Sequence, residues 1–453
     1  MMKRVPPRRA TKTDPLEREI EVVLHPGHFI SHGAGWSFVE GLERVEERIA
    51  KLVPNVPARA VALYETFLAG SYEKAEELDD SSGNFGMFVG SLFRGWVRAR
   101  QASGADPDET ALRLVAWMGD DPYGFCYKLE RDLVKVLDKR GLAAFERRIR
   151  EQFDGVGTVA PGPGEHQRDP AFLRRRAAVI LRAVLVEQRN VESYVALCEA
   201  TELSPADCLA LAKIVQARRK PADALAWVDR GLALEKKQPS SFADYELGKL
   251  KRDLLVKLGR GDAALDAAWA DFNAHPSKYS YADLMRYVPR AERTVWHQKA
   301  MDAALGADLH SLIELWLETK EIDRLVQRLR KAHDEEIEGI SHFATEPVAQ
   351  KLAMTHPDVA ARVYRALGMR ILKAKKSKYY HAALSNFEDA RRCYERAGLG
   401  AKWESLVREV RTEHHRKTGF MAGFEEVAAG GGRPAKPTFL ERAKARWSTS
   451  AED

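Results

Sequence analysis

The segment 381–398, HAALSNFEDARRCYERAG, carries the pattern that decides the fold. Five apolar side chains recur along it at spacings of four, three, four and three residues: Ala383, Phe387, Ala390, Tyr394 and Ala397. These spacings place all five side chains on one face of an α-helix. Alanine alternates with aromatic residues on that face, so a second helix can approach closely. The segment therefore predicts a helix that packs against another helix.

Two other segments mix small and aromatic residues in the same way: PADALAWVDRGLALE from Pro221 and GDAALDAAWADF from Gly261. Such helices are typical of tetratricopeptide-type helix pairs, although the full repeat consensus is not met. Strand patterns are nearly absent. We expect an all-α chain in which helical-hairpin repeats form a tetratricopeptide-like α-solenoid, with an N-terminal helical subdomain.

Helix starts recur along the chain as a capping residue followed by proline at the first helical position. The pairs are Asp14-Pro15, Asp106-Pro107, Asp169-Pro170, Ser204-Pro205 and His356-Pro357. Glu17 and Glu109 stand three residues after Asp14 and Asp106, which predicts a capping box at each of these two helix starts.

The distribution of glycine, proline and charge predicts five parts. Residues 1–13 form a basic disordered tail, and 14–154 form an N-terminal helical region. A glycine- and proline-rich linker, GVGTVAPGPGEHQRDP, occupies 155–170. A C-terminal helical-repeat region follows over 171–428. Residues 429–453 form a flexible basic tail with room for one short helix.

The formal charge of +6 comes from the two ends of the chain. Residues 1–12 contribute +5 and residues 429–453 contribute +2, which leaves −1 for the body. A near-neutral body does not supply a broad phosphate-binding face, so any nucleic-acid contact is expected from the tails or from a local basic patch. The candidate residues are Lys3, Arg4, Arg8, Arg9, Arg433, Lys436, Arg442, Lys444 and Arg446.

The four cysteines are widely spread and form no CxxC motif, which favours reduced, buried thiols. No apolar segment follows the basic N-terminus, and no apolar run reaches the length of a membrane span. We therefore expect a cytoplasmic protein that does not enter a membrane.

Several segments resemble an uncharacterised bacterial helical family. They are 26–32 (PGHFISH), 36–42 (WSFVEGL), 76–86 (EELDDSSGNFG) and a C-terminal run from Tyr379 through Trp403 to Lys417. This family is similar to the C-terminal helical part of SWIM zinc-finger proteins, and the likeness covers roughly residues 20–428. It implies tetratricopeptide-like helices that hold other proteins. The CxC zinc motif of SWIM proteins is missing here, so their zinc chemistry is not carried over.

Two polar segments are candidates for ion binding. His25, His28 and His32 are close enough in sequence to meet a divalent ion, but the intervening Pro-Gly turn favours an ordinary loop. The segment 79–84, DDSSGN, lacks the ligand order of a calcium loop and is better explained as a helix cap. We therefore predict no metal site, with the three histidines as the only candidates.

Catalytic motifs are missing as well. The sequence contains no HExxH, GxSxG or GxxxxGK[ST], so we assign no catalytic residue and no cofactor. We predict a non-catalytic scaffold or adaptor that binds a protein or peptide through its helical surface. The alternatives are a protein that binds nucleic acid through its basic tails and an unrecognised metal-dependent enzyme.

Overall fold

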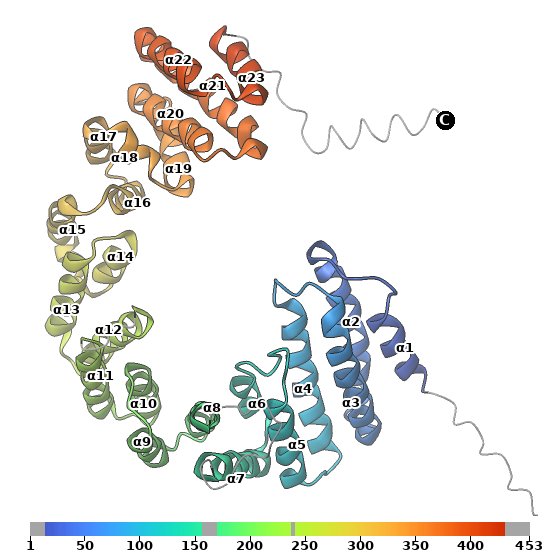
Figure 1. The fold of residues 1–453 in the computed structure, drawn as a ribbon. Helices are drawn as coiled ribbons and strands as arrows, with labels where there is room; N and C mark the ends of the chain where they lie inside the picture. Colours follow the sequence, from blue (N-terminus) through green and yellow to red (C-terminus); the bar gives the residue numbers. More distant parts are fainter. Residues whose placement is uncertain (1–13, 156–169, 237–240, 431–453) are drawn as a thin grey trace, which may run out of the picture. The chain divides into compact units, whose positions relative to one another are not determined.

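The computed structural model of the chain describes residues 14–155, 170–236 and 241–430 (Figure 1). Within these ranges the backbone forms 23 α-helices and a few short 3-10 turns. The only β pairing in the same ranges is an isolated bridge between Ile30 and Leu78. The prediction of an all-α chain is confirmed. None of the described helices combines the length and apolarity needed to cross a membrane.

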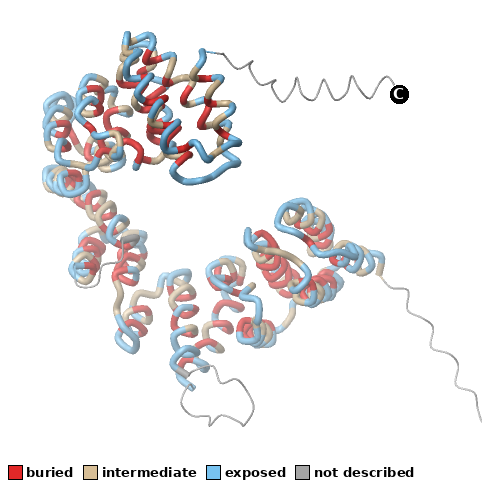
Figure 2. The backbone as a smooth tube through the Cα atoms, turned by 45° about the horizontal axis from the view of Figure 1, so that its top comes forward, coloured by how far each residue is buried: buried red, intermediate tan, exposed pale blue. Residues whose placement is uncertain are grey.

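The described residues fold as two compact units, which are divided between Leu254 and Leu255. Each unit is built from helices that pack against neighbours close in sequence. Figure 2 shows buried residues along one side of most helices, as expected for amphipathic helices that share a core with their neighbours.

Twelve helices begin in the first unit. They are α1 (Pro15–Leu24), α2 (Gly35–Ala50), α3 (Pro57–Lys74), α4 (Asn84–Ala102), α5 (Pro107–Gly119), α6 (Glu130–Val136), α7 (Lys139–Gly155), α8 (Pro170–Glu187), α9 (Val191–Ala200), α10 (Pro205–Ala217), α11 (Pro221–Glu235) and α12 (Ser241–Lys257). The main pairs are α3 with α4, α5 with α7, α7 with α8, and α10 with α11. Aromatic rings wedge between helices, as where Trp96 of α4 meets Trp117 of α5 edge-on at 4.8 Å.

Eleven helices lie in the second unit. They are α13 (Gly261–Ala274), α14 (Lys278–Tyr287), α15 (Arg293–Ala303), α16 (Leu309–Thr319), α17 (Ile322–Lys331), α18 (Asp334–Glu338), α19 (His342–Leu352), α20 (Pro357–Lys373), α21 (Tyr380–Arg396), α22 (Gly400–His414) and α23 (Thr418–Ala428). The segment that predicted the fold is α21. Four of its five pattern residues are buried, and Ala397 is the half-buried C-cap. Helix α21 packs along α20 and contacts α22 and α23, so the predicted tetratricopeptide-like hairpin repeats are confirmed.

The predicted helix starts agree with the structure, whereas the two predicted capping boxes do not form. Prolines begin α1, α5, α8, α10 and α20 as expected. The carboxylate of Asp14 accepts from Leu16 N, two residues on, and binds the guanidinium of Arg59 at 2.6 Å. Glu109 turns to Arg100 instead of its own helix start, with an N–O distance of 3.1 Å. Asp14 thus keeps its capping hydrogen bond while it also binds Arg59, whereas Glu109 pairs with an arginine of the preceding helix.

The five-part division stays a prediction. Most of the linker, 156–169, lies outside the described residues, as do 1–13 and 431–453. On either side of the linker, α7 ends at Gly155 and α8 begins at Pro170, and these two helices pack against each other.

Candidate functional site

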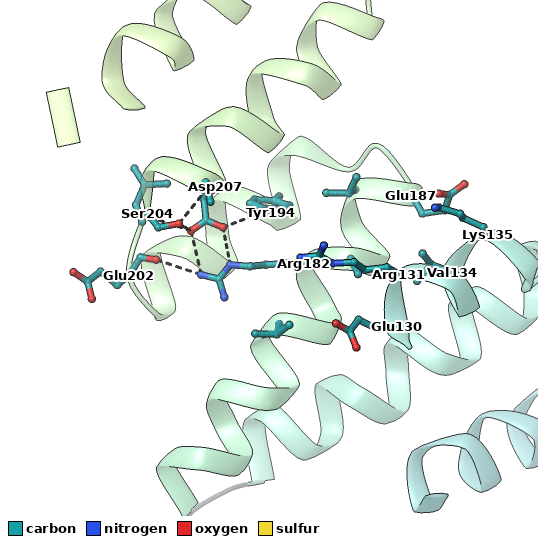
Figure 3. A pocket seen from close by; sticks show the side chains of 15 residues that line it. Glu130, Arg131, Val134, Lys135, Arg182, Glu187, Tyr194, Glu202, Ser204 and Asp207 are labelled. Atoms are coloured by element: carbon teal, nitrogen blue, oxygen red, sulfur yellow. Dashed lines mark hydrogen bonds and ion pairs between the residues drawn. The ribbon is translucent and has the colours of Figure 1, made fainter. Parts of the chain in front are cut away.

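An open groove of about 730 Å³ crosses the surface of the first unit (Figure 3). Helix α8 forms its floor, α6 forms one wall, and the turn between α9 and α10 forms the other. Because all three elements belong to one compact unit, the groove is a fixed feature of that unit.

The floor of the groove presents apolar side chains to solvent. Val179 and Val186 of α8 line the groove, and Phe172 continues the same row seven residues earlier on α8, outside the groove lining. These three residues are 46%, 39% and 49% exposed. The opposite face of α8 packs into the core, where Ile180 and Leu181 are buried. A surface helix ordinarily has one apolar face. Helix α8 has two, and the second, which we call the α8 stripe, has no cover among the described residues.

An ion pair holds the floor to the turn between α9 and α10. Arg182 of α8 donates from Nε to Asp207 Oδ1 at 2.7 Å and from Nη2 to Thr201 Oγ1 at 2.9 Å. The hydroxyl of Tyr194 donates to the same Asp207 oxygen at 2.8 Å. Asp207 is only 3% exposed, so this carboxylate is buried with its partners in place.

Local sequence explains why Asp207 sits there. Ser204 is the N-cap of α10 and Asp207 is the third helical residue, and the two side chains and backbone amides form a reciprocal capping box. Burial alone raises the pKa of Asp207, but the hydrogen bonds from Arg182 and Ser204 outweigh it and leave the pKa below its usual value. The Asp207 carboxylate therefore stays ionised and links α8 to the start of α10.

The two walls of the groove carry opposite charge. Arg131 and Lys135 lie one turn apart on the exposed face of α6, and neither forms an ion pair within the described ranges. Glu202 is exposed on the opposite wall. Figure 3 shows Glu202 at one end of the Arg182 side chain and Arg131 beyond its other end. Buried Glu130 is neutralised by Arg176 at 3.3 Å.

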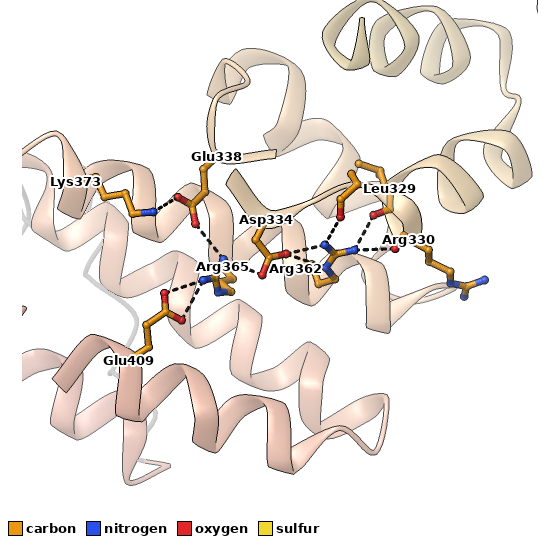
Figure 4. A network of polar contacts seen from close by, with 9 residues as sticks. Leu329, Arg330, Asp334, Glu338, Arg362, Arg365, Lys373 and Glu409 are labelled. Atoms are coloured by element: carbon orange, nitrogen blue, oxygen red, sulfur yellow. Dashed lines mark hydrogen bonds and ion pairs between the residues drawn. The ribbon is translucent and has the colours of Figure 1, made fainter. Parts of the chain in front are cut away.

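A second hollow, of about 850 Å³, lies in the second unit beside α17, α20 and α22. Several of its charged side chains are engaged with neighbouring groups (Figure 4). Arg365 reaches Glu338 at 3.0 Å and Glu409 at 2.8 Å. Arg362 donates to the carbonyl oxygens of Leu329 at 2.7 Å and Ala332 at 2.6 Å, which caps the C-terminal end of α17. The guanidinium groups of Arg362 and Arg365 in this hollow therefore already have partners within the second unit.

The candidate metal ligands are spread around the loop after α1. His25 is the C-cap of α1, and the ring of His28 contacts the carbonyl oxygen of Pro26 at 3.1 Å. Gly27 between them has a φ of +79°, which turns the chain. His32 begins a short 3-10 turn further on. In the described part of the chain, no three His, Cys, Asp or Glu side chains form a group that could hold a metal ion.

The segment 79–84 behaves as the predicted cap. Asp80 accepts from the backbone amides of Phe85 and Gly86, both at 2.9 Å, at the start of α4. The nine basic tail residues proposed for nucleic-acid contact all lie outside the described residues.

The groove is the feature that the sequence analysis missed. A signal for it exists, because Phe172, Val179 and Val186 repeat every seven residues on a helix that already has a complete apolar face. That repeat alone does not reveal which apolar face of α8 is buried by other helices. The helices that pack beside α8, α6 and α7, are separate segments of the sequence.

The comparisons with known proteins place the chain in a family without assigning an activity. The model of a family described as Family of unknown function (DUF6880) matches residues 21–422. No curated protein matches the chain.

Three solved structures are similar in part. One is titled "Structure of Naa15/Naa10 bound to HypK-THB" (12% identity, 96% of this chain and 71% of that chain covered, TM-score 0.33). Another is a "Circular tandem repeat protein with novel repeat topology and enhanced subunit contact surfaces" (12% identity, 97% and 98% covered, TM-score 0.19). The third is "Crystal structure of APC/C hetero-tetramer Cut9-Hcn1" (10% identity, 86% and 89% covered, TM-score 0.20). With TM-scores this low, the fold assignment rests on the helix packing itself.

Proposed function

The chain belongs to the family of unknown function DUF6880, and from that premise we propose that it is a non-catalytic scaffold that binds a protein partner in the groove over α8. The observation that carries the proposal is the α8 stripe, an exposed apolar row on a helix whose other apolar face is already buried. Val179 and Val186, with the half-buried Ala183 between them, form an apolar row framed by polar residues, an arrangement typical of protein-binding sites.

The size of the stripe sets how much affinity it can supply. Full burial of a Val or Phe side chain gains about 1.5–3 kcal/mol, so covering three that are half exposed gains roughly 2–4 kcal/mol. A micromolar complex needs about 8 kcal/mol. The charged walls and the backbone of the partner must contribute the remainder, which favours a partner that fits the whole groove.

The chemistry of the groove favours binding over catalysis. Asp207 is ionised and fully engaged by Arg182, Tyr194 and Ser204. The pKa of the Tyr194 hydroxyl is raised well above its ordinary value, first by burial and then by the charge of Asp207. Neither group has the free position and matched pKa that a general acid or base uses.

Two finer points belong to the same proposal. We place the protein in the cytoplasm, a compartment consistent with its four free, buried cysteines. We also propose that the chain is bacterial and that its family is similar to the C-terminal helical part of SWIM zinc-finger proteins. Nucleic-acid binding by the tails stays a prediction that rests on sequence charge.

Photo-crosslinking in cells that naturally make the protein tests the proposal. A photoreactive amino acid is introduced in place of Val186 in the groove or, as a control, in place of Val256, a 49% exposed valine of α12. We expect discrete protein adducts from position 186 that disappear when Val179→Glu is added, and none from position 256. Identical adducts from both positions, or none from position 186, contradict the proposal.

A further inference from the structure

We propose that the groove, together with the α8 stripe that extends from it to Phe172, receives an amphipathic α-helix of about four turns whose two flanks carry opposite charge, with the acidic flank along α6. This inference rests on the proposed function and names the class of partner. It is drawn from the spacing of the α8 stripe and from the charges on the two walls.

The spacing of the stripe selects a helical partner. Phe172, Val179 and Val186 repeat every seven residues, the interval at which the contact line between two packed helices repeats. At 1.5 Å per residue the stripe is about 21 Å long, which matches a helix of about 14 residues. Side chains on one face of an extended peptide repeat about every 6.6 Å, out of step with the roughly 10.5 Å between stripe residues.

The walls select the charge of each flank. Arg131 and Lys135 stand at i and i+4 on α6, with no ion pair in the described ranges, so they favour carboxylates on the side of the partner that faces them. Across the groove, Glu202 favours a basic residue, and its backbone is fixed because its carbonyl oxygen accepts from Arg182 at 3.2 Å. Glu187, at the end of α8, lies beside Lys135 in Figure 3 and offsets part of its charge. Arg131 is therefore expected to contribute more than Lys135.

The chain's own tails have the wrong charge for this position. Residues 1–12 carry +5, and residues 429–453 carry +2 with only three acids. A basic segment along α6 would face Arg131 and Lys135 with like charge. Charge complementarity thus points to a separate, partly acidic helix as the occupant.

A displayed library of 14-residue helices tests the inference on the full-length protein. The helices carry leucine at positions that face the stripe, and their two flanks vary among Glu, Lys and Ser. Selections use the wild type, the double variant Arg131→Glu/Lys135→Glu, and a matched control, Lys351→Glu/Arg408→Glu, which changes exposed charges in the second unit by the same amount. Library members that also bind the Val179→Glu variant are removed before the binders are counted.

We expect wild type and control to enrich helices with Glu on one flank and Lys on the other. The groove variant should shift the acidic flank to Lys and bind the wild-type selection about tenfold more weakly, since two exposed charges on α6 change sign. Enriched helices without any flank preference overturn the charge assignment but leave the groove as a binding site. No enrichment over Val179→Glu overturns both. Displacement of the selected helix by a peptide of residues 431–453 also overturns the inference.

Discussion

The ring of Phe387 on α21 lies directly against Gly368 on α20. A Cβ atom added to Gly368 would stand 2.7 Å from Cζ of Phe387, closer than side chains approach. The glycine thus creates the space that the aromatic residue fills, and Phe387 is fully buried as a result. The pairing explains the small-and-aromatic pattern in the segment 381–398, because α20 and α21 approach closely where α20 has no side chain.

Gly368→Ala should destabilise the second unit by about 1–2 kcal/mol. Alanine is favoured over glycine within a helix by roughly 0.5–1 kcal/mol, but overpacking costs about 1–3 kcal/mol, and the rigid ring cannot move aside. Hydrogen exchange of α20 and α21 in mild denaturant measures the change. Gly419→Ala in α23, where an added Cβ meets nothing within 4 Å, is the control and should be neutral or stabilising. Equal hydrogen-exchange protection of α20 and α21 in the two variants contradicts the close packing of Phe387 on Gly368.

Asp207→Asn should destabilise the first unit by about 2–4 kcal/mol at pH 7, because Arg182 loses its charged partner in a buried setting. The folded pKa of Asp207 is lowered, so its contribution to stability is complete above the unfolded pKa of about 3.9 and is lost as pH falls through the folded value. Urea unfolding should therefore show a gap between wild type and variant that narrows toward pH 3.

A control for this titration is Asp223→Asn, which changes an exposed carboxylate at the start of α11. We expect its unfolding midpoint to stay close to that of the wild type at both pH values. A gap for Asp207→Asn that stays constant from pH 7 to pH 3 would mean that the carboxylate charge does not stabilise the fold.

Arg365→Met should cost about 3–5 kcal/mol, because it leaves Glu338 and Glu409 without the guanidinium that joins them. Arg365→Lys should cost less but not be neutral, since one ammonium cannot reproduce the forked contacts. Adding Glu409→Gln to Arg365→Met should recover part of the loss, which a double-mutant cycle measures. Arg392→Met, at an exposed ion pair, is the control and should change stability by less than about 1 kcal/mol.

The four thiols should be unreactive in the folded protein. All are buried, and burial raises the pKa of Cys126 to about 12 and those of Cys198 and Cys208 to about 11. Because the thiolate is the reactive form, DTNB at pH 8 should react at least about a hundredfold faster after unfolding in guanidinium. A cysteine that reacts at once in the native protein contradicts the burial described.

Local chemistry explains which features could be predicted from the sequence. A capping residue followed by proline fixes a helix start within a few residues, and the starts at Pro15, Pro107 and Pro205 are where the sequence placed them. The face of α21 was likewise predictable because burial follows the helical period. Both signals are contained within one helix.

The errors and omissions involve partners distant in sequence. Glu109 leaves its predicted capping box because Arg100 of α4 is within reach. The groove was missed because Val179 and Val186 are apolar and look like core residues. Only the positions of α6 and of the turn at Ser204 show that they face solvent.

The most direct test of the central claim, that the α8 stripe binds a partner helix, is the affinity of one selected helical peptide for three forms of the full-length protein. Fluorescence anisotropy compares the wild type with Val179→Glu and Val256→Glu, which introduce the same charge at valines of similar exposure. We predict binding at least about twentyfold weaker for Val179→Glu, since the contact must then bury a carboxylate, and within about twofold of wild type for Val256→Glu. Equal affinity of all three proteins contradicts the claim.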